Sequence, residues 1–287
     1  MAAARRTLSV AAWNVNGLRA RAGRVESWLT RNRIDVLLAS ETRADPGDPA
    51  EAALLLDGRD LHHHSAPGGR NGVAISAARP LKDVADGFGA PLAAELRRRA
   101  EAEGWEPAWC DEPRLTSAVV EGVRFASLYV PNGRTLDHPH YRFKLAWLDA
   151  LGAQVRAWAA EGPLVVGGDF NVAPDDLDCW NPKGWRGRTH VSPPERERIA
   201  ALTTAGGGPL VDLWRTCHGP EAVGFTWWNY RTLGFQKGQG LRIDLLLATE
   251  DLAERSRCEV DVDERAAEGP SDHAPVVATL RLPERGR

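Results

Sequence analysis

Hydrophobic and polar positions along the chain predict short strands and helices that follow one another without a linker or a repeat. Short apolar runs bounded by glycine, proline or polar turns predict strands over residues 7–13, 34–39, 71–76, 115–120, 123–130, 164–166, 225–230, 241–248, 258–263 and 276–282. Helical spacing predicts helices over residues 19–33, 50–56, 141–160 and 195–203, while residues 93–104 fit either a surface helix or an insertion. Paired runs such as 115–130 indicate sheets that are partly antiparallel. The pattern predicts one α/β domain.

Polar side chains gather where the predicted strands end. Asp169 and Asn171 follow the buried run 164–166, and two residues apart in extended chain they point to the same face. A carboxylate beside a carboxamide can bind a cation, take a proton or donate to an anion. Taken alone, each such residue also fits a local turn or a solvated side chain. The strand ends with this character carry Asn14, Asn16, Glu41, Tyr129, Asn132, Arg134, Asp169, Asn171, Asp272 and His273. Because ligands of α/β folds gather at strand ends, the set predicts one acidic pocket.

Asp244 stands in the apolar middle of the predicted strand 241–248. A carboxylate is costly to bury unless it is hydrogen-bonded or paired. Its position therefore predicts a buried polar partner.

Composition and charge narrow the class of protein. The chain has 287 residues, of which 43% are hydrophobic and 26% charged, as is ordinary for a globular protein. No apolar run reaches membrane-spanning length and the N-terminal segment does not resemble a signal peptide, so we expect a cytoplasmic protein that does not bind membranes. A net charge of −3 and a pI of about 6.3 argue against binding nucleic acid through bulk charge, but they allow a local basic face.

The cysteines and histidines do not predict a zinc site. The four cysteines lie far apart without a Cys-x-x-Cys pair, so neither a zinc knuckle nor a disulfide framework is indicated. His62, His63 and His64 resemble a metal-binding tract, but no acidic partners follow them, and we interpret this stretch as a solvated loop. A metal would therefore bind oxygen ligands, which favours Mg²⁺ or Mn²⁺.

The polar strand ends belong to longer motifs. These are Trp-Asn-Val-Asn-Gly-Leu-Arg-Ala-Arg at 13–21, Glu-Thr at 41–42, Tyr-Val-Pro-Asn-Gly at 129–133, Gly-Asp-Phe-Asn at 168–171, Leu-Arg-Ile-Asp at 241–244 and Ser-Asp-His-Ala-Pro at 271–275. In this order they closely resemble the exonuclease III family of apurinic/apyrimidinic (AP) endonucleases, over residues 8–282. The wider endonuclease/exonuclease/phosphatase superfamily shares some of these elements among DNases, sphingomyelinases and inositol phosphatases, but the motifs at 13–21 and 241–244 favour its DNA-repair branch.

The resemblance implies a four-layer α/β sandwich, in which two mixed β-sheets pack face to face between helices. It implies a single catalytic domain over residues 1–287, with residues 1–6 as a flexible N-terminus. It also implies Mg²⁺-dependent cleavage of DNA 5′ to abasic sites, with 3′→5′ exonuclease and 3′-end-cleaning activities in the same pocket; Mn²⁺ is a possible substitute. The expected partner is double-stranded DNA with abasic sites or recessed or blocked 3′ ends, and the expected state is a monomer.

The resemblance further implies roles for the strand-end residues. Asp169 would orient or deprotonate the attacking water, while Asn171 and Tyr129 would donate hydrogen bonds to the phosphate. His273 would contact the phosphate, with Asp244 as its buried partner. The implied metal ligands are Asn14, Asn16, Glu41, Asp169, Asn171, Asp272 and His273, of which Glu41 is the main carboxylate. The candidate DNA contacts are Asn132, Arg134, Trp227, Trp228, Lys237, Leu241, Arg242 and Ile243.

Two positions depart from the family pattern. Ser40 stands where the family usually has a glutamine that supports the metal site, so a looser site or room for a water molecule is expected there. Trp227, Leu241 and Ile243 would form the wall of a pocket for the flipped-out abasic sugar. Leu241 stands where some relatives have tryptophan, which leaves open how strongly abasic sites are preferred over plain exonuclease action.

Two other functions are consistent with parts of the pattern. One is a superfamily phosphodiesterase that acts on a lipid or inositol phosphate. The other is a non-catalytic module that binds damaged DNA. The DNA-type motifs argue against the first, and the presence of Asp169, Asp244 and His273 together argues against the second, because binding alone does not require them.

Overall fold

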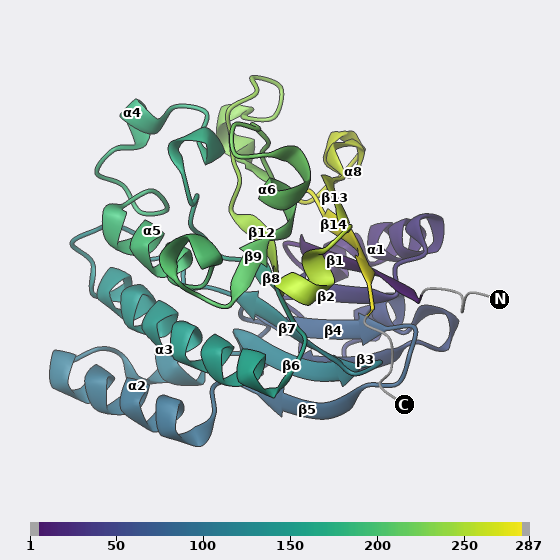
Figure 1. Cartoon of the computed structure of the whole chain (residues 1–287), viewed down its shortest axis with the longest axis horizontal. Helices are drawn as coiled ribbons and strands as arrows, with labels where there is room; N and C mark the ends of the chain where they lie inside the picture. The colour runs from purple at the N-terminus through teal and green to yellow at the C-terminus, as the bar shows by residue number, and fades with distance from the viewer. Residues whose placement is uncertain (1–5, 283–287) are drawn as a thin grey trace.

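The computed structural model describes residues 6–282, which form two six-stranded β-sheets and a two-stranded ribbon (Figure 1). The first sheet has the strand order β13-β14-β1-β2-β4-β3, and the second has the order β5-β6-β7-β8-β12-β9. The strands are β1 (Thr7–Asn14), β2 (Val36–Ser40), β3 (Asp60–His64), β4 (Val73–Ala77), β5 (Lys82–Asp86), β6 (Leu115–Val120), β7 (Val123–Tyr129), β8 (Leu164–Asp169), β9 (Leu210–Asp212), β10 (Trp227–Trp228), β11 (Gly240–Leu241), β12 (Asp244–Thr249), β13 (Arg257–Val260) and β14 (Val276–Arg281). The pairs β1–β2 and β7–β8 are parallel and the neighbouring pairs are antiparallel, so both sheets are mixed.

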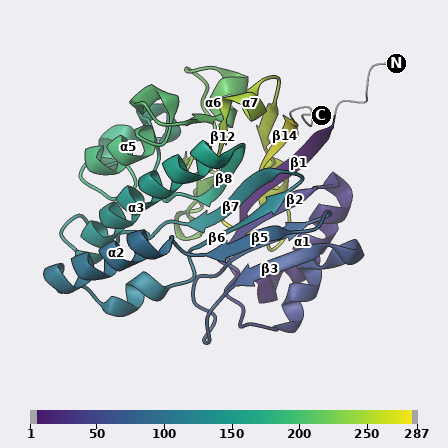
Figure 2. The ribbon, with the colours of Figure 1, turned by 60° about the horizontal axis from the view of Figure 1, so that its bottom comes forward.

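Helices cover the outer face of each sheet (Figure 2). The α-helices are α1 (Leu18–Asn32), α2 (Ala90–Glu103), α3 (Pro139–Glu161), α4 (Pro182–Trp185), α5 (Pro193–Ala200), α6 (Leu213–His218), α7 (Glu250–Ala253) and α8 (Val262–Ala266). One core joins α1 and the 3-10 helix Pro49–Leu54 to the first sheet, and another joins α2, α3 and α5 to the second. A third core lies between the two sheets, where side chains such as Val10 and Leu38 meet Phe125 and Val165. The predicted four-layer α/β sandwich is confirmed.

Most predicted elements appear within a few residues of their expected bounds, because their apolar faces are those that the layers bury. Residues 93–104, which by sequence fit either a surface helix or an insertion, form most of α2. The expected flexible segment 1–6 lies outside the described residues except for Arg6.

The interpretation of His62, His63 and His64 as a solvated loop is wrong. These residues form the end of β3, which pairs in register with β4. His63 Nε2 lies 2.8 Å from the Thr42 hydroxyl, whereas His62 and His64 both face Asp86 on β5. The tract is therefore an edge strand whose polar side chains have partners on neighbouring segments.

No helix within residues 6–282 is both long enough and apolar enough to cross a membrane.

The close pairing of β7 with β8 depends on Gly168. Gly168 lies opposite Leu128 with φ +142, and a Cβ atom there would lie 2.0 Å from the Leu128 carbonyl oxygen. We expect Gly168→Ala to lower the free energy of unfolding by about 3 kcal/mol, because both the backbone angle and the contact are unfavourable for a side chain. Urea denaturation measures the change.

Gly152→Ala is the matched control for this substitution. Gly152 lies within α3, and an added Cβ atom would meet its nearest neighbour at 3.7 Å, an ordinary contact. Alanine is the better helix former by about 1 kcal/mol, so this variant should be as stable as the wild type or more stable. Equal denaturation midpoints for the two variants would contradict the steric argument.

Candidate active site

Strand pairing brings the polar strand ends of both sheets together. The parallel β1 and β2 place Asn14 beside the end of β2, directly before Glu41. The parallel β7 and β8 place Tyr129 opposite Asp169, and the antiparallel β8 and β12 place Asp169 opposite Asp244. Residues far apart in the sequence therefore converge on one edge of the sandwich, as the pattern of strand ends predicts.

The centre of the site is a buried cluster of Asn14, Glu41, Asp169 and His273. Asn14 Nδ2 donates to Glu41 Oε1 at 2.9 Å and to Asp169 Oδ2 at 3.0 Å. His273 Nε2 lies 3.9 Å from the same Asp169 oxygen. The second oxygen of Glu41 pairs with the guanidinium of Arg43. One amide thus fixes two carboxylates, and the imidazole closes the cluster.

His273 is held from behind by Asp244. His273 Nδ1 lies 2.8 Å from Asp244 Oδ2, and both residues are buried. Asp244 itself is placed by its backbone N–H, which donates to the Thr226 hydroxyl at 3.0 Å. The buried polar partner that the sequence predicts for Asp244 is therefore present, and it is His273.

Burial and like charges shift the pKa values of the central groups. Burial by itself lowers the pKa of His273, but Asp244 and Asp169 outweigh it and raise this pKa to about 10. Burial raises the pKa of Asp169, and the Asp244 and Glu41 carboxylates act in the same direction while His273 opposes them. Burial also raises the pKa of Tyr129, with Glu41 adding to the shift. The pocket therefore holds an imidazolium, a neutral phenol and a carboxyl group with increased proton affinity, a combination suited to proton transfer.

Asn16 and Asp272 form a separate pair at the rim. Asn16 Nδ2 donates to Asp272 Oδ1 at 2.7 Å, and Trp227 Nε1 donates to Asp272 Oδ2 at 3.0 Å. Both Asp272 oxygens are therefore already hydrogen-bonded. Within residues 6–282, the acidic and histidine groups close enough to share a metal ion are Glu41, Asp169 and His273, and Asp272 is not among them.

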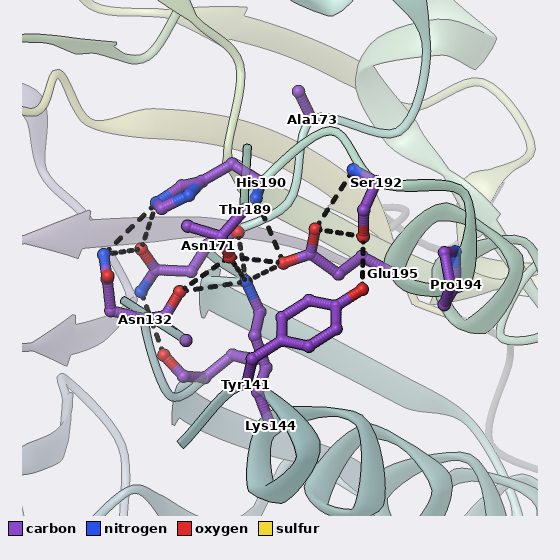
Figure 3. Close-up of polar contacts among 12 residues, drawn as sticks. Asn132, Tyr141, Lys144, Asn171, Ala173, Thr189, His190, Ser192, Pro194 and Glu195 are labelled. Carbon is purple, nitrogen blue, oxygen red and sulfur yellow. Dashed lines mark hydrogen bonds and ion pairs between the residues drawn. The ribbon is translucent and has the colours of Figure 1, made fainter. Parts of the chain in front are cut away.

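Asn171, two residues after Asp169, is hydrogen-bonded on several sides (Figure 3). Its backbone N–H donates to Asp169 Oδ1 at 2.8 Å, and its Nδ2 donates to the Val130 carbonyl at 2.9 Å. Its Oδ1 faces Asn132 Nδ2 at 3.2 Å and His190 Nε2 at 3.1 Å. The amide oxygen thus points away from Asp169.

The residues predicted to contact DNA divide by exposure. Asn132, Arg134 and Lys237 are exposed, as a contact with DNA requires. Arg242 is only 1% exposed and lies between Asp178, at 2.7 Å, and Asp212, at 2.8 Å. The prediction that Arg242 contacts DNA is wrong, because its guanidinium is already paired inside the protein.

The three residues predicted to form an apolar wall lie in one hydrophobic cluster. Leu241 and Ile243 are buried, and they pack with half-buried Trp227 and Trp185. The Trp185 and Trp227 rings meet edge to face with centroids 6.4 Å apart. Trp228 is buried behind this wall and packs against Phe235 (ring centroids 5.1 Å apart).

Several residues near the site lie outside the motifs that the sequence reveals. Arg43 and His190 lie in irregular segments and Trp185 ends the short helix α4, and no periodic pattern marks any of them. Lys144 did carry a signal, because it occupies a core position of the helical stripe in α3, where a lysine needs a buried partner. That partner is Glu195.

The donor chemistry of the central cluster fits a hard divalent cation. The carboxylates of Glu41 and Asp169 and a ring nitrogen of His273 present ligand atoms within 4.8 Å of one another. Carboxylate oxygens suit Mg²⁺ or Mn²⁺. Asn14 Oδ1 accepts from the Asn16 backbone N–H at 3.0 Å, so its amide presents nitrogen, not oxygen, to the carboxylates. Ser40 is fully buried beside Glu41, and its hydroxyl has no hydrogen-bond partner, which is consistent with a support that is weaker than an amide would provide.

Comparison with known proteins places this site in a family. Residues 11–273 match the model of the endonuclease/exonuclease/phosphatase family. The chain belongs to this family. It is 30% identical to "Exodeoxyribonuclease III" of Haemophilus influenzae, with 94% of this chain and 98% of the relative covered.

The chain is also similar to solved structures of nucleases. A 3′-5′ exonuclease (NExo) from Neisseria meningitidis is 35% identical with a TM-score of 0.84, and an AP endonuclease from Archaeoglobus fulgidus is 32% identical with a TM-score of 0.83. In both cases 96% of this chain and 100% of the other chain are covered. A further structure is described as the 3′ phosphatase NExo bound to a product DNA hairpin. The chain is therefore a hydrolytic enzyme of the nuclease type.

Proposed function

We propose that this chain is a Mg²⁺-dependent DNA-repair nuclease that hydrolyses phosphate esters in duplex DNA. Its substrates are 3′ ends, from which it removes nucleotides and blocking phosphates, and the phosphodiester 5′ to abasic sites. The observation that carries the proposal is the buried cluster of Asn14, Glu41, Asp169 and His273. The relatives of the chain, among them an exodeoxyribonuclease III, an AP endonuclease and a 3′ phosphatase with a DNA product, support DNA as the substrate.

The carboxylates of Glu41 and Asp169 would hold the cation, whereas the protonated His273 beside them has no free ring nitrogen to bind it. A Mg²⁺ ion held there would supply charge neutralisation for the phosphate that is hydrolysed. Asp169, with its raised pKa, takes the proton of the attacking water. Asp244 keeps His273 protonated and oriented, so that Nε2–H points into the pocket and can donate to a phosphate oxygen.

Two neutral donors complete the phosphate site. The pKa of Tyr129 is raised by burial, so its phenol keeps its proton and can donate a hydrogen bond. Asn171 Nδ2 donates to the Val130 carbonyl at 2.9 Å and lies 3.3 Å from Asp169 Oδ2, so it would donate to the phosphate by exchanging the longer contact, the one with Asp169. Such fixed donors stabilise charge that develops on the phosphate in the transition state.

The apolar wall bears on the balance between the two activities. Leu241 is 0% and Ile243 is 2% exposed, and both pack with Cys179 and Val191. A flipped-out abasic sugar requires room at this wall, whereas a 3′ end can reach the buried cluster without such a flip. We therefore propose that hydrolysis at 3′ ends exceeds incision at abasic sites.

Cleavage of two labelled duplexes tests this function. One contains a single abasic-site analogue, and the other is undamaged with a recessed 3′ end. We expect Mg²⁺-dependent cleavage of both, faster at the 3′ end, a loss of at least about 100-fold in EDTA and full recovery with excess Mg²⁺.

The outcome also separates the alternatives. DNA cleavage that persists in EDTA would contradict the proposed metal chemistry, and incision faster than 3′ hydrolysis would contradict the proposed balance. Hydrolysis of an inositol phosphate in place of DNA would favour the lipid or inositol branch. The affinity of the protein for an inositol phosphate would change less with salt concentration than its affinity for DNA, because a small ligand releases few counterions on binding. Binding without cleavage in any condition would favour a damage-binding protein.

A further inference from the structure

A fully buried ion pair lies behind the active site. The side chains of Lys144 on α3 and Glu195 on α5 are both 0% exposed, and Lys144 Nζ lies 2.5 Å from Glu195 Oε1 (Figure 3). Removing two charges from water is expensive, and an apolar pair of the same volume is often as stable or more stable. A contribution to overall stability therefore explains this ion pair poorly. The other contacts of Lys144 and Glu195 indicate what the pair does.

Lys144 joins the turns that follow two central strands. Its ammonium donates to the Asn171 carbonyl at 2.7 Å and to the Asn132 carbonyl at 3.3 Å. Asn171 follows β8 and Asn132 follows β7, so one cation holds the ends of two adjacent strands. Asn171 has φ +51, a backbone angle that needs support from its surroundings.

Glu195 holds the neighbouring segment in place. Its Oε1 accepts from the Thr189 hydroxyl at 2.7 Å and from the His190 backbone N–H at 3.0 Å. Its Oε2 accepts from the backbone N–H of Ser192 at 3.1 Å and from the Ser192 hydroxyl at 2.6 Å. These bonds place His190, whose Nε2 lies 3.1 Å from Asn171 Oδ1.

The two charges act on the two oxygens of one residue. Lys144 binds the backbone oxygen of Asn171 directly, and Glu195 places His190 against the side-chain oxygen. With both oxygens held, the two N–H groups of Asn171 face Asp169: the backbone N–H donates to Oδ1 at 2.8 Å and Nδ2 lies 3.3 Å from Oδ2. Displacement of a positioned group by about 1 Å can cost on the order of 100-fold in rate.

We infer that Lys144 and Glu195 are positioning residues for the proposed hydrolysis, because together they hold Asn171 against Asp169. The inference rests on the proposed function for its effect on turnover, but its structural part does not. The variant that tests it is Lys144→Met/Glu195→Gln, which removes both charges and keeps similar shapes. No buried charge is left without its partner in this double variant.

The first measurement requires no activity. Hydrogen–deuterium exchange followed by mass spectrometry reports the protection of residues 169–172, where the Asn171 N–H is bonded to Asp169. We expect exchange in this segment to rise at least tenfold in the double variant, while segments of β1 and β14 keep wild-type protection. Unchanged protection would overturn the inference whether or not the protein is a nuclease.

The second measurement is turnover on the recessed 3′ end. We expect kcat to fall 30- to 300-fold and KM to change less than threefold, since the exposed DNA-facing residues are untouched. The matched control is Glu264→Gln. Glu264 is also buried and pairs with Arg24 and Arg31, but it joins α8 to α1. This control should lose thermal stability with kcat unchanged.

The two measurements separate the possible failures. If the double variant loses the protection of 169–172 but kcat falls no more than in Glu264→Gln, the positioning role is overturned. If the wild type hydrolyses none of the DNA substrates, the proposed function fails, and the exchange result alone decides whether the pair holds Asn171. Should the double variant fail to fold, Glu195→Asp, which keeps both charges but shortens the reach of the carboxylate to Lys144, is measured in the same two ways.

Discussion

Asp169→Asn should lower kcat by on the order of 10³-fold or more while the protein still binds DNA. Asparagine has nearly the same shape and keeps an oxygen for the Asn171 N–H, but it cannot take a proton from water. The effect should fall on the transition state and therefore on kcat, not on KM. Single-turnover cleavage of the recessed 3′ end measures the rate, and an electrophoretic binding assay in EDTA measures the affinity.

Asp261→Asn is a suitable control for this substitution. Asp261 also accepts a side-chain hydrogen bond, from Trp28 Nε1 at 2.7 Å, and it caps α8 away from the central cluster. We expect a small loss of stability and no change in turnover. Turnover of Asp169→Asn within a few-fold of the wild type would remove Asp169 from the role of base.

Much of the fold could be predicted because burial in a layered sandwich leaves a clear pattern. The strand 164–166 and the helix 141–160 have apolar faces that match the cores on either side of the second sheet. Two of the elements that the sequence did not reveal lack such faces. β5 (Lys82–Asp86) is exposed along its length, and the β3 residues His62 to His64 carry polar side chains on both faces. At a sheet edge, backbone pairing and polar partners hold a strand without apolar alternation.

The convergence of the site could be predicted, but its pairings could not. Strand ends that carry polar residues indicate a common pocket, and Glu41, Asp169 and His273 do meet there. Which residue lies opposite which depends on strand order and register, as in the pairing of Asp244 with Asp169, and a single sequence does not contain that register. The sequence does not contain the orientation of Asn14 either. Its amide nitrogen faces the carboxylates because its oxygen accepts a hydrogen bond from the Asn16 backbone N–H.

Buried charged residues differ in how easily the sequence reveals that they are paired. Asp244 could be recognised because it interrupts an apolar strand, and the structure gives it a partner in His273. Arg242 lies two residues before it, and the resemblance makes it a candidate DNA contact, although the same argument of burial applies to it. A charged residue inside a buried stretch is thus better interpreted as half of a pair than as a ligand-binding group.

The pair of His273 and Asp244 should behave as one unit in a double-mutant cycle. Each of His273→Ala and Asp244→Ala should lower kcat/KM by about 10²- to 10³-fold, because His273 donates to the phosphate only while Asp244 keeps it charged and oriented. The double variant should lose little more than His273→Ala alone, since Asp244 has no further effect once the imidazole is absent. Urea denaturation of each variant checks that the fold persists.

A pH profile separates this coupling from a loss of packing. Burial lowers the pKa of His273 and Asp244 is the largest influence that raises it, so removal of Asp244 lowers that pKa. Activity that requires the imidazolium is lost as pH rises through the pKa of His273. The alkaline limb of kcat/KM should therefore move to lower pH in Asp244→Ala, whereas a purely structural defect would lower the whole profile without moving that limb. Simple multiplication of the two single effects, with an unmoved alkaline limb, would show that the two residues act separately, and His273 would then need another source for its charge.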